Sequence, residues 1–196
     1  MKRASMSLLT VCGLEELEAH RERRVSHILS ILDPGTPDPD EFSAWDRHHR
    51  TTLRFHDIID PMDGMILPAP EHVRAIVEFG EELVEEAEKG REEHLLIHCH
   101  MGISRSTAAM TTMLAIAYPD EDGDALLERL TAIRPQAWPN LRMVGFADEI
   151  LGRSDLAGAT TRLHARQIAA RPHLADVFRR LGRGREVELA TALPAT

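Results

Sequence analysis

One stretch in the middle of the chain brings a thiol, a glycine and an arginine together within seven residues. Cys99 follows the apolar run 95–98 and precedes a segment, 105–118, with the pattern of a buried helix. A tight loop before a helix can turn its backbone N–H groups toward an anion, and this environment stabilises a thiolate. Gly102 allows a turn that a side chain would block, and the guanidinium of Arg105 can hold two oxygens of a tetrahedral oxyanion. These residue types predict a site where sulfur attacks a phosphate.

The stretch from His98 to Ser106 resembles the signature of cysteine-based protein tyrosine phosphatases and reads HCHMGISRS. The signature has His-Cys, five residues that include a Gly, then Arg and Ser or Thr, and every fixed position is met here. The mid-chain place of the motif and the short strands before it are similar to the compact dual-specificity type. The segment 55–58 and the pairs 134–135 and 139–140 look like the atypical bacterial members. The resemblance covers about residues 25–151.

The resemblance implies a role for each residue of the motif. Cys99 would be the nucleophile that forms a phosphocysteine, and Arg105 would bind the phosphate and the transition state. Ser106 would help the thiolate leave in the second step, and the buried His98 would order the loop. The resemblance implies no metal and no cofactor. The phosphate oxygens would be held by the backbone N–H groups of His100, Met101, Gly102, Ile103, Ser104 and Arg105.

The leaving oxygen needs a proton and the attacking water needs a base, and one carboxylic acid on a mobile loop can serve both steps. In the family this Asp comes just after the strand that precedes the long helix. Asp57, Asp60 and Asp63 all lie there, and Asp57 matches best because it directly follows that strand. Its separation from Cys99 is longer than in compact dual-specificity enzymes, owing to the Pro-rich stretch 61–70. The other two carboxylates would be solvated or would cap turns.

The same residues have other interpretations. Cys99 could be an inert buried thiol, and His94, His98 and His100 could be metal ligands together with it. The complete motif argues against the first, and the lack of a second carboxylate or Cys pair argues against the second. Cys12 is expected to be a strand residue, with the alternative that it is a redox partner of Cys99.

Some residues near the motif are expected to have structural roles. His48 and His49 belong to an exposed charged stretch, with the alternative that they hold the phosphorylated residue of a substrate. Trp138 is expected to pack at a turn between helices rather than form a substrate platform. Asn140 is expected to cap the helix that follows it. Phe55 is expected to face the core.

The loop itself limits the class of substrate. In this superfamily, loops that take highly charged phosphoinositides usually contain Lys, and none is present between Cys99 and Arg105. The sequence therefore predicts hydrolysis of a phosphomonoester with little neighbouring charge, most readily phosphotyrosine in a protein, with phosphoserine and phosphothreonine also open. The alternatives are a lipid or nucleotide phosphatase with the same loop, a phosphoprotein-binding pseudophosphatase, and a thiol-redox protein.

Strands alternate with helices along the chain, which predicts an α/β fold. We expect three layers, with a central, mostly parallel sheet flanked by helices and the phosphate loop between a central strand and a buried helix. The carboxyl ends of such strands carry the active site. Apolar patterning and turn residues predict strands at 8–12, 25–32, 50–56, 95–98 and 186–189, and helices at 14–23, 71–89, 105–118, 124–133, 141–151, 163–170 and 174–181.

The whole chain has the size and composition of one domain. It has 196 residues, 43% hydrophobic residues and a net charge of −9, which disfavours nucleic acid and anionic membranes as partners. We expect a phosphatase domain over 1–152 and a helical extension over 153–196.

Two cysteines indicate a reducing compartment, so the expected location is the cytoplasm. The faintly signal-like start is better explained by a first strand, since Val11 precedes Cys12 and acidic residues follow. The oligomeric state is left open.

Overall fold

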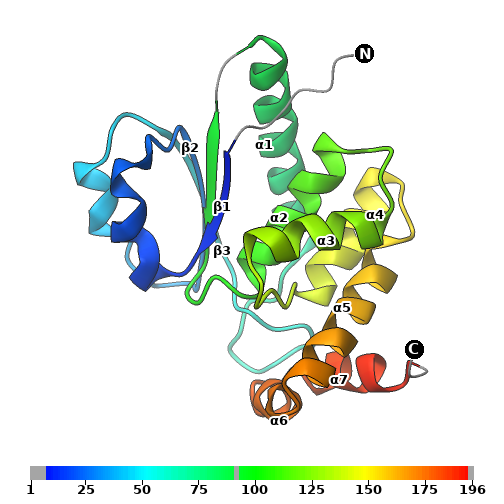
Figure 1. Ribbon diagram of the computed structural model, residues 1–196. Coiled ribbons are helices and arrows are strands. Elements are labelled where there is room, and N and C mark those ends of the chain that lie inside the picture. Colours follow the sequence, from blue (N-terminus) through cyan, green and yellow to red (C-terminus); the bar gives the residue numbers. More distant parts are fainter. Residues whose placement is uncertain (1–7, 91–92, 194–196) are drawn as a thin grey trace.

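Four parallel strands form the centre of the computed structural model, which describes residues 8–90 and 93–193. The strand order is β1-β4-β2-β3, so β4 lies between β1 and β2 and is buried along its whole length (Figure 1). At the carboxyl end of the sheet, Cys12 and Ser30 are the register partners of His98. The strands are β1 (Leu8–Cys12), β2 (His27–Leu32), β3 (His49–Arg54) and β4 (His94–His98).

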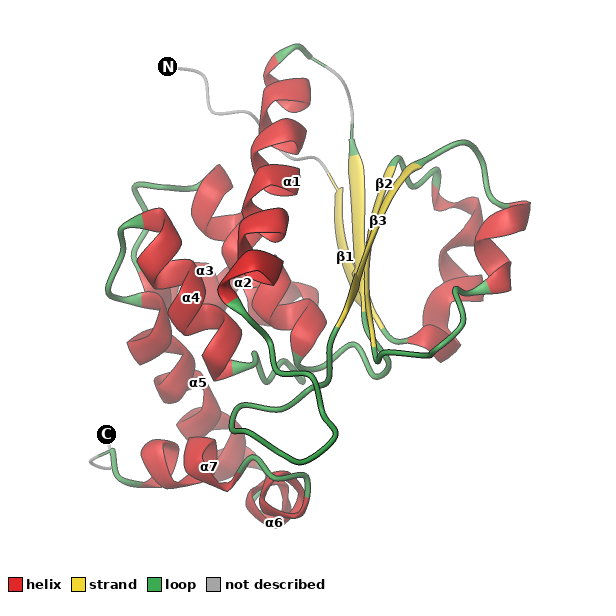
Figure 2. Ribbon diagram, turned by 180° about the vertical axis from the view of Figure 1, so that it is seen from behind, coloured by secondary structure: helices red, strands yellow, loops and turns green. Residues whose placement is uncertain are grey.

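Helices cover both faces of this sheet, which confirms the predicted α/β class. One face carries the helices α1 (Pro70–Glu88), α2 (Arg105–Ala117), α3 (Gly123–Ile133) and α4 (Leu141–Leu151). Two 3₁₀ helices, η1 (Leu14–Arg23) and η2 (Asp40–Ala44), lie against the other face (Figure 2). Each layer has its own apolar core because a parallel sheet must be buried on both sides.

Helix α2 is the centre of the larger core and positions the loop before it. Its residues from Arg105 to Ala115 are all buried, and most of them are small or unbranched. It packs against α1, α3, α4 and strand β4. At Gly80 of α1, a Cβ would lie 2.7 Å from the sulfur of Met113, so the two helices approach closely there. This packing fixes the amino end of α2, where the phosphate loop ends.

The chain continues beyond α4 into three further helices that lie together at one end of the molecule (Figure 1). They are α5 (Leu156–Ala170), α6 (His173–Arg180) and α7 (Gly184–Thr191). Helix α5 packs against α3 and α4, and both α6 and α7 pack against α5. A small apolar cluster joins these helices to the turn before α4 and consists of Trp138, Ala175, Phe178 and Val187.

Most predicted elements are confirmed to within two residues at each end, but the prediction for the last segment is wrong. Residues 186–189 are part of helix α7 and not of a strand. The alternation of Glu and apolar residues suggested a strand, whereas the buried positions Glu186, Val187 and Ala190 follow helical spacing. Helix α5 also begins at Leu156, well before the predicted 163.

Within the described residues, no helix is long and apolar enough to cross a bilayer. The basic start of the chain lies outside the described residues.

Candidate active site

The loop that carries the cysteine motif connects the end of β4 to the start of α2. His98 anchors its beginning, since the buried Nε2 lies 2.7 Å from the Ser30 hydroxyl on the neighbouring strand. Burial of the ring lowers the pKa of His98 to about 4, so the imidazole is neutral at physiological pH. A neutral, buried ring can order the loop, which is the role that the resemblance implies.

Arg134, in the segment after α3, donates hydrogen bonds to two backbone carbonyls of this loop. Arg134 Nε donates to the Gly102 carbonyl at 3.0 Å, and its Nη2 donates to the Met101 carbonyl at 3.1 Å. The carboxylate of Glu16 on η1 pairs with the same guanidinium at 2.9 and 2.8 Å. The outer side of the loop is therefore tied to two other segments of the chain.

The neighbouring carbonyls of the loop are also occupied on this outer side. The His100 carbonyl accepts from the Leu14 N–H at 3.0 Å, and the Ile103 carbonyl accepts from the Trp138 N–H at 2.9 Å. In a planar trans peptide the next N–H points the opposite way, so the N–H groups of 101–104 face the other side of the loop. None of them donates to a described residue. The loop thus presents a row of free donors suited to an anion.

The backbone at Gly102 shows why a glycine stands in the loop. Its φ is +67°, and a Cβ there would lie 2.4 Å from the carbonyl carbon of Cys12. Both the left-handed conformation and the close approach to the end of β1 exclude a side chain. The sequence prediction of a turn that only Gly permits is therefore confirmed.

Two cysteines lie near each other at the carboxyl end of the sheet but in different settings. Cys99 is 2% exposed, and its Sγ is 3.2 Å from the Ser106 hydroxyl. Cys12 is a buried strand residue, as predicted. Burial, with a smaller effect of Glu16, raises the pKa of the Cys12 thiol to about 12. The Cys12 thiol is therefore protonated at physiological pH.

Arg105 is held along one edge of its guanidinium and free on another. It is 3% exposed, and Nη1 donates to the Asp33 carboxylate at 2.6 Å and to the Phe55 carbonyl at 2.5 Å. Its Nε is buried and has no partner. Sequence reasoning missed Asp33, although its place directly after β2 was a usable signal, because the carboxyl ends of parallel strands share one edge. Phe55 is fully buried, as predicted.

Of the three candidate acids, only Asp57 lines the same cavity as Cys99. Its Oδ1 accepts from Ser104 Oγ at 2.7 Å and from Asn140 Nδ2 at 2.9 Å. Asp60 instead pairs with the exposed Arg185 at 2.9 Å, and Asp63 is exposed in a turn.

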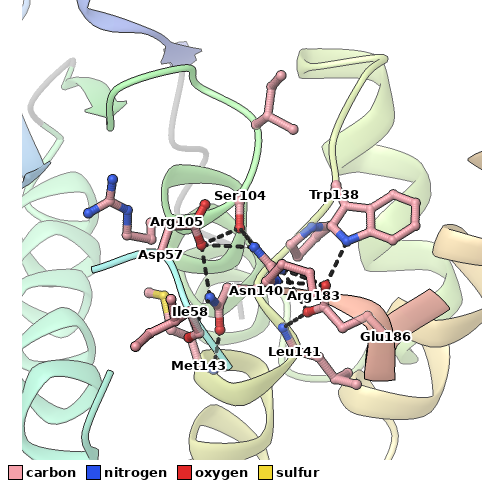
Figure 3. A network of polar contacts seen from close by, with 12 residues as sticks. Asp57, Ile58, Ser104, Arg105, Trp138, Asn140, Leu141, Met143, Arg183 and Glu186 are labelled. Atoms are coloured by element: carbon pink, nitrogen blue, oxygen red, sulfur yellow. Dashed lines mark hydrogen bonds and ion pairs between the residues drawn. The ribbon is translucent and has the colours of Figure 1, made fainter. Parts of the chain in front are cut away.

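A third donor to Asp57 comes from the far end of the chain (Figure 3). The Nη1 of Arg183, at the amino end of α7, lies 2.9 Å from Asp57 Oδ1 and 2.8 Å from Ser104 Oγ. Burial raises the pKa of Asp57, but the guanidiniums of Arg183 and Arg105 outweigh it and the net pKa lies below its ordinary value. No sequence pattern indicated Arg183.

Glu186 completes this buried network beneath the site. Its carboxylate accepts from Arg183 at 2.8 and 2.7 Å, from the Trp138 indole N–H at 2.8 Å and from the Leu141 backbone N–H at 2.8 Å. Trp138 is stacked between the rings of His164 and Phe178, as expected of a packing residue. The network therefore joins the turn before α4 to the last helix.

Asn140 has the predicted capping role and a second one. Its Oδ1 accepts from the Met143 N–H at 3.2 Å at the start of α4. Its Nδ2 donates to Asp57, which the sequence did not indicate. His49 lies in β3 and is exposed, and His48 bonds only locally to the Asp46 carbonyl. Among the described residues, no three His, Cys, Asp or Glu side chains are arranged to share a metal ion.

A cavity of about 590 Å³ opens above the thiol. Its floor is the phosphate loop, with Cys99 and Arg105, and Asp33 and Asp57 stand at its sides. Helix α6 and the turn after it also line the cavity. A buried thiol, free N–H donors, a free guanidinium edge and a carboxylate thus face one recess, which is the set needed to bind a phosphate and transfer it to sulfur.

Comparison with known proteins identifies the class of fold. By sequence, the chain matches no protein-family model and no curated protein. Its structure is similar to human DUSP28, with a TM-score of 0.55 and 16% identity over 76% of this chain and 94% of that one. It is also similar to the Yvh1 phosphatase domain from Chaetomium thermophilum, with a TM-score of 0.51 and 23% identity over 72% and 88%. PTPMT1 in complex with PI(5)P gives a TM-score of 0.53 and 12% identity over 76% and 93%.

These likenesses show that the chain has the fold of dual-specificity and tyrosine phosphatases. At such identities they show the fold alone. About a quarter of this chain has no counterpart in those structures.

Proposed function

We propose that this protein is a cysteine-dependent phosphatase that hydrolyses phosphomonoesters, with phosphotyrosine in proteins as its main substrate. Phosphoserine and phosphothreonine would be further substrates. The observation that carries the proposal is the unpartnered, buried Nε of Arg105 in the same recess as the Cys99 thiol. A buried donor without an acceptor destabilises a fold, so it indicates a ligand. A phosphate supplies several acceptor oxygens, and it also fits the free N–H groups of 101–104.

The chemistry takes two steps. First, Cys99 Sγ attacks phosphorus, the bond from phosphorus to the substrate oxygen breaks, and Asp57 gives that oxygen its proton. Phosphate is then carried on sulfur as a phosphocysteine. Next, water attacks phosphorus while Asp57 takes its proton, and the bond from sulfur to phosphorus breaks to release inorganic phosphate. Ser106, whose hydroxyl lies 3.2 Å from Sγ, donates to the sulfur as it regains its charge.

Arg105 and the loop act on the phosphoryl group in both steps. The Nε edge of the guanidinium and the N–H groups of 101–104 bind the oxygens that gain charge in the transition state. Asp33 and the Phe55 carbonyl fix the opposite edge, so the free edge is already oriented before substrate arrives. Such preorganised donors are worth more than mobile ones because they need no rearrangement during the reaction.

Three finer assignments belong to this proposal. The chain is related to the atypical bacterial tyrosine phosphatases that its sequence resembles. It acts in the cytoplasm on phosphorylated proteins. Residues 1–152 form the phosphatase domain, and 153–196 form a helical extension of it.

Hydrolysis assays test the proposed function. Wild type and Cys99→Ser would be given p-nitrophenyl phosphate, phosphotyrosine and phosphothreonine peptides, and phosphoinositide vesicles, with reductant and a metal chelator. We expect wild type to hydrolyse phosphotyrosine, and Cys99→Ser to be inactive. Acid quenching should trap one phosphate on Cys99 in the wild type, detected by mass spectrometry. Cys12→Ala is the matched control and should keep the activity.

Different outcomes separate the alternatives. Faster hydrolysis of phosphoinositides or nucleotides than of phosphotyrosine would identify a lipid or nucleotide phosphatase. Activity that survives in Cys99→Ser would contradict the mechanism. Inert wild type that still binds phosphopeptides would indicate a pseudophosphatase.

A further inference from the structure

The cavity above the thiol is larger and more apolar than a phosphate requires. Its volume of about 590 Å³ falls within the range of pockets that hold small organic ligands. Beyond the phosphate loop, its apolar walls are formed by Met62 and Met65 of the 57–69 loop and by Trp138. The polar side chains there belong to His56, Gln136 and Arg171. Helix α6 and the turn after it supply the remaining apolar wall, with Leu174, Val177, Phe178 and Leu181.

Exposed apolar side chains are concentrated at the mouth of this cavity. Among the described residues, eight large hydrophobic side chains are exposed, and four of them line it. These four are Met62, Met65, Met101 and Leu181. Clustered apolar exposure marks a binding surface, and methionine adapts to differently shaped partners.

The wall built by α6 is held rigidly in place. The ring of Phe178 is stacked on Trp138 with centroids 3.9 Å apart, and Trp138 is fixed by its bond to Glu186. On the other side, a Cβ at Gly182 would lie 3.2 Å from the sulfur of Met62, so the 57–69 loop closely approaches the turn after α6. The apolar space is thus a built part of the site.

We propose that this cavity is a specificity site that takes a large apolar side chain next to the phosphotyrosine of a peptide substrate. The proposal rests on the proposed function. The recessed Cys99, which is 2% exposed, favours a long phosphorylated side chain over a short one, and the apolar walls accept its ring. The space toward Leu174 and Leu181 then receives the neighbouring residue. A peptide fits better than an anionic bilayer because the chain carries a net charge of −9, and apolar walls disfavour inositol polyphosphates.

Paired phosphotyrosine peptides test this specificity. The two peptides differ only in the residues that flank phosphotyrosine, Leu in one and Ser in the other. For wild type we expect kcat/KM to be about tenfold or more higher for the Leu peptide, the ratio that burying one leucine side chain provides. Labelled forms of both peptides, titrated into Cys99→Ser, should show the same preference in Kd.

Two leucine variants test whether the preference for the Leu peptide arises in this cavity. Leu181 and Leu189 are both exposed, but only Leu181 lines the cavity. Leu181→Asp should bring the ratio between the two peptides close to one, while Leu189→Asp should keep the wild-type ratio. Because both side chains are exposed, neither change should unfold the protein.

Different outcomes of these assays distinguish the specificity site from the phosphatase activity. Hydrolysis of both peptides at equal kcat/KM overturns the specificity site and leaves the phosphatase intact. A binding preference without hydrolysis by wild type keeps the specificity site and overturns the phosphatase. Preferential hydrolysis of a monophosphorylated phosphoinositide in vesicles over both peptides overturns the peptide assignment.

A second observation concerns how the acid is held. Asp57 Oδ1 accepts from Ser104, Asn140 and Arg183, so three donors converge on one oxygen. A proton on the carboxyl group is therefore left to Oδ2. Arg183 is 1% exposed, and its Nε and Nη2 are fixed by Glu186. Its position is set by the packing of α7 and not by the 57–69 loop.

We infer that Arg183 is a positioning residue that directs the proton-carrying oxygen of Asp57 toward the leaving group. The charged groups that act on Asp57 are Arg183 from α7 and Arg105 from α2. The titratable His100 of the phosphate loop also interacts with Asp57, and burial holds the pKa of its imidazole below the ordinary value. Asp33 faces Arg105 from the end of β2, and Glu186 faces Arg183 from behind.

Leaving groups of different acidity test this role. A correctly placed acid matters most for a poor leaving group, so Arg183→Met should lose far more rate on phenyl phosphate than on p-nitrophenyl phosphate. The basic limb of its kcat/KM profile should also move to higher pH, because a cation beside Asp57 is removed. Arg183→Lys should restore part of both properties.

Arg185→Met is the control, since Arg185 lies two residues further along α7, is exposed and pairs with Asp60. It should leave both leaving-group dependence and pH profile unchanged. Equal losses on the two phenyl esters in Arg183→Met and Arg183→Lys would reduce Arg183 to a structural residue. Changes in Arg185→Met alone would transfer the acid role to Asp60.

Discussion

At the scale of single residues, the site depends on how three carboxylates share two arginines. Asp33 occupies one edge of Arg105 and leaves the Nε edge free for phosphate. Asp57 shares Arg183 with the buried Glu186, so neither carboxylate is left without a partner. Each carboxylate therefore orients a guanidinium or is oriented by one, and the reacting groups need little rearrangement.

The pH dependence of the rate follows from the state of Asp57. Burial raises the pKa of Asp57, but Arg183 and Arg105 lower it by more than burial raises it. The net pKa of Asp57 therefore lies below its ordinary value. A general acid must carry its proton, and the rate therefore falls as pH rises through this pKa. We expect an optimum on the acid side of neutrality. In Asp57→Asn the basic limb should disappear, and the optimum rate should fall by about 10²–10⁴.

Steady-state rates from pH 4.5 to 8.5 check this prediction, with Asp60→Asn as the matched control. Asp60 does not line the cavity, so its removal should preserve the profile. A basic limb that persists in Asp57→Asn would show that another group supplies the proton.

The sequence could predict only part of this chemistry. The motif predicts Cys99 and Arg105 as site residues because their spacing within one loop is itself the signal. Asp33 and Arg183 lie outside this motif and meet the site from 72 and 79 positions away, at Arg105 and Ser104. Only Asp33 had a signal in the sequence, which was its place at the end of a strand. Contacts of that separation are fixed by the packing of whole elements, which no local pattern records.

At the scale of elements, the phosphate loop is shaped by what binds its outer side. Arg134, the start of η1 and the turn before α4 occupy its carbonyls, and this leaves the N–H groups for an anion. The loop also passes close to the end of β1. Its shape is therefore a property of four neighbouring segments and not of the motif alone.

Two glycine substitutions test this dependence. Gly102→Ala must accept a left-handed φ and a contact with Cys12 backbone atoms, so we expect a loss of about 2 kcal/mol or more in unfolding free energy and loss of activity. Gly145→Ala meets nothing within 4 Å on helix α4 and should stabilise the protein by about 0.5–1 kcal/mol. Urea unfolding measures both changes. A Gly102→Ala protein as stable and active as wild type would contradict the geometry of the loop.

Element prediction succeeded where pattern and burial agree and failed where a buried charge broke the pattern. Strand β4 is apolar and central, and α1 has clear helical spacing, so both were predicted nearly in full. In α7, Glu186 is fully buried because it binds Arg183, Trp138 and Leu141. A buried Glu counts as polar in any periodicity, which made the segment resemble a strand.

At the scale of the whole molecule, the sheet and the terminal helices each bury a neutral histidine. His98 lies beneath the phosphate loop, and His164 of α5 is stacked against Trp138. Burial lowers the pKa of His98 to about 4 and holds that of His164 well below its ordinary value. The sheet and the terminal helices should therefore both lose stability as the pH falls.

The unfolded chain takes up protons on these histidines at a higher pH than the folded protein does. Their stabilising effect is thus complete above about pH 6.5 and is lost as pH falls toward 4, with His98 alone contributing about 3 kcal/mol over that interval.

We expect the unfolding free energy, measured in urea from pH 7.5 to 4.5, to fall steeply below pH 6.5. His164→Gln should flatten this dependence, whereas His173→Gln, at an exposed position, should not. A flat profile in the wild type would mean that these rings are protonated in the fold. Two separate transitions at low pH, with only the later one shifted in His164→Gln, would show that the terminal helices unfold independently of the sheet.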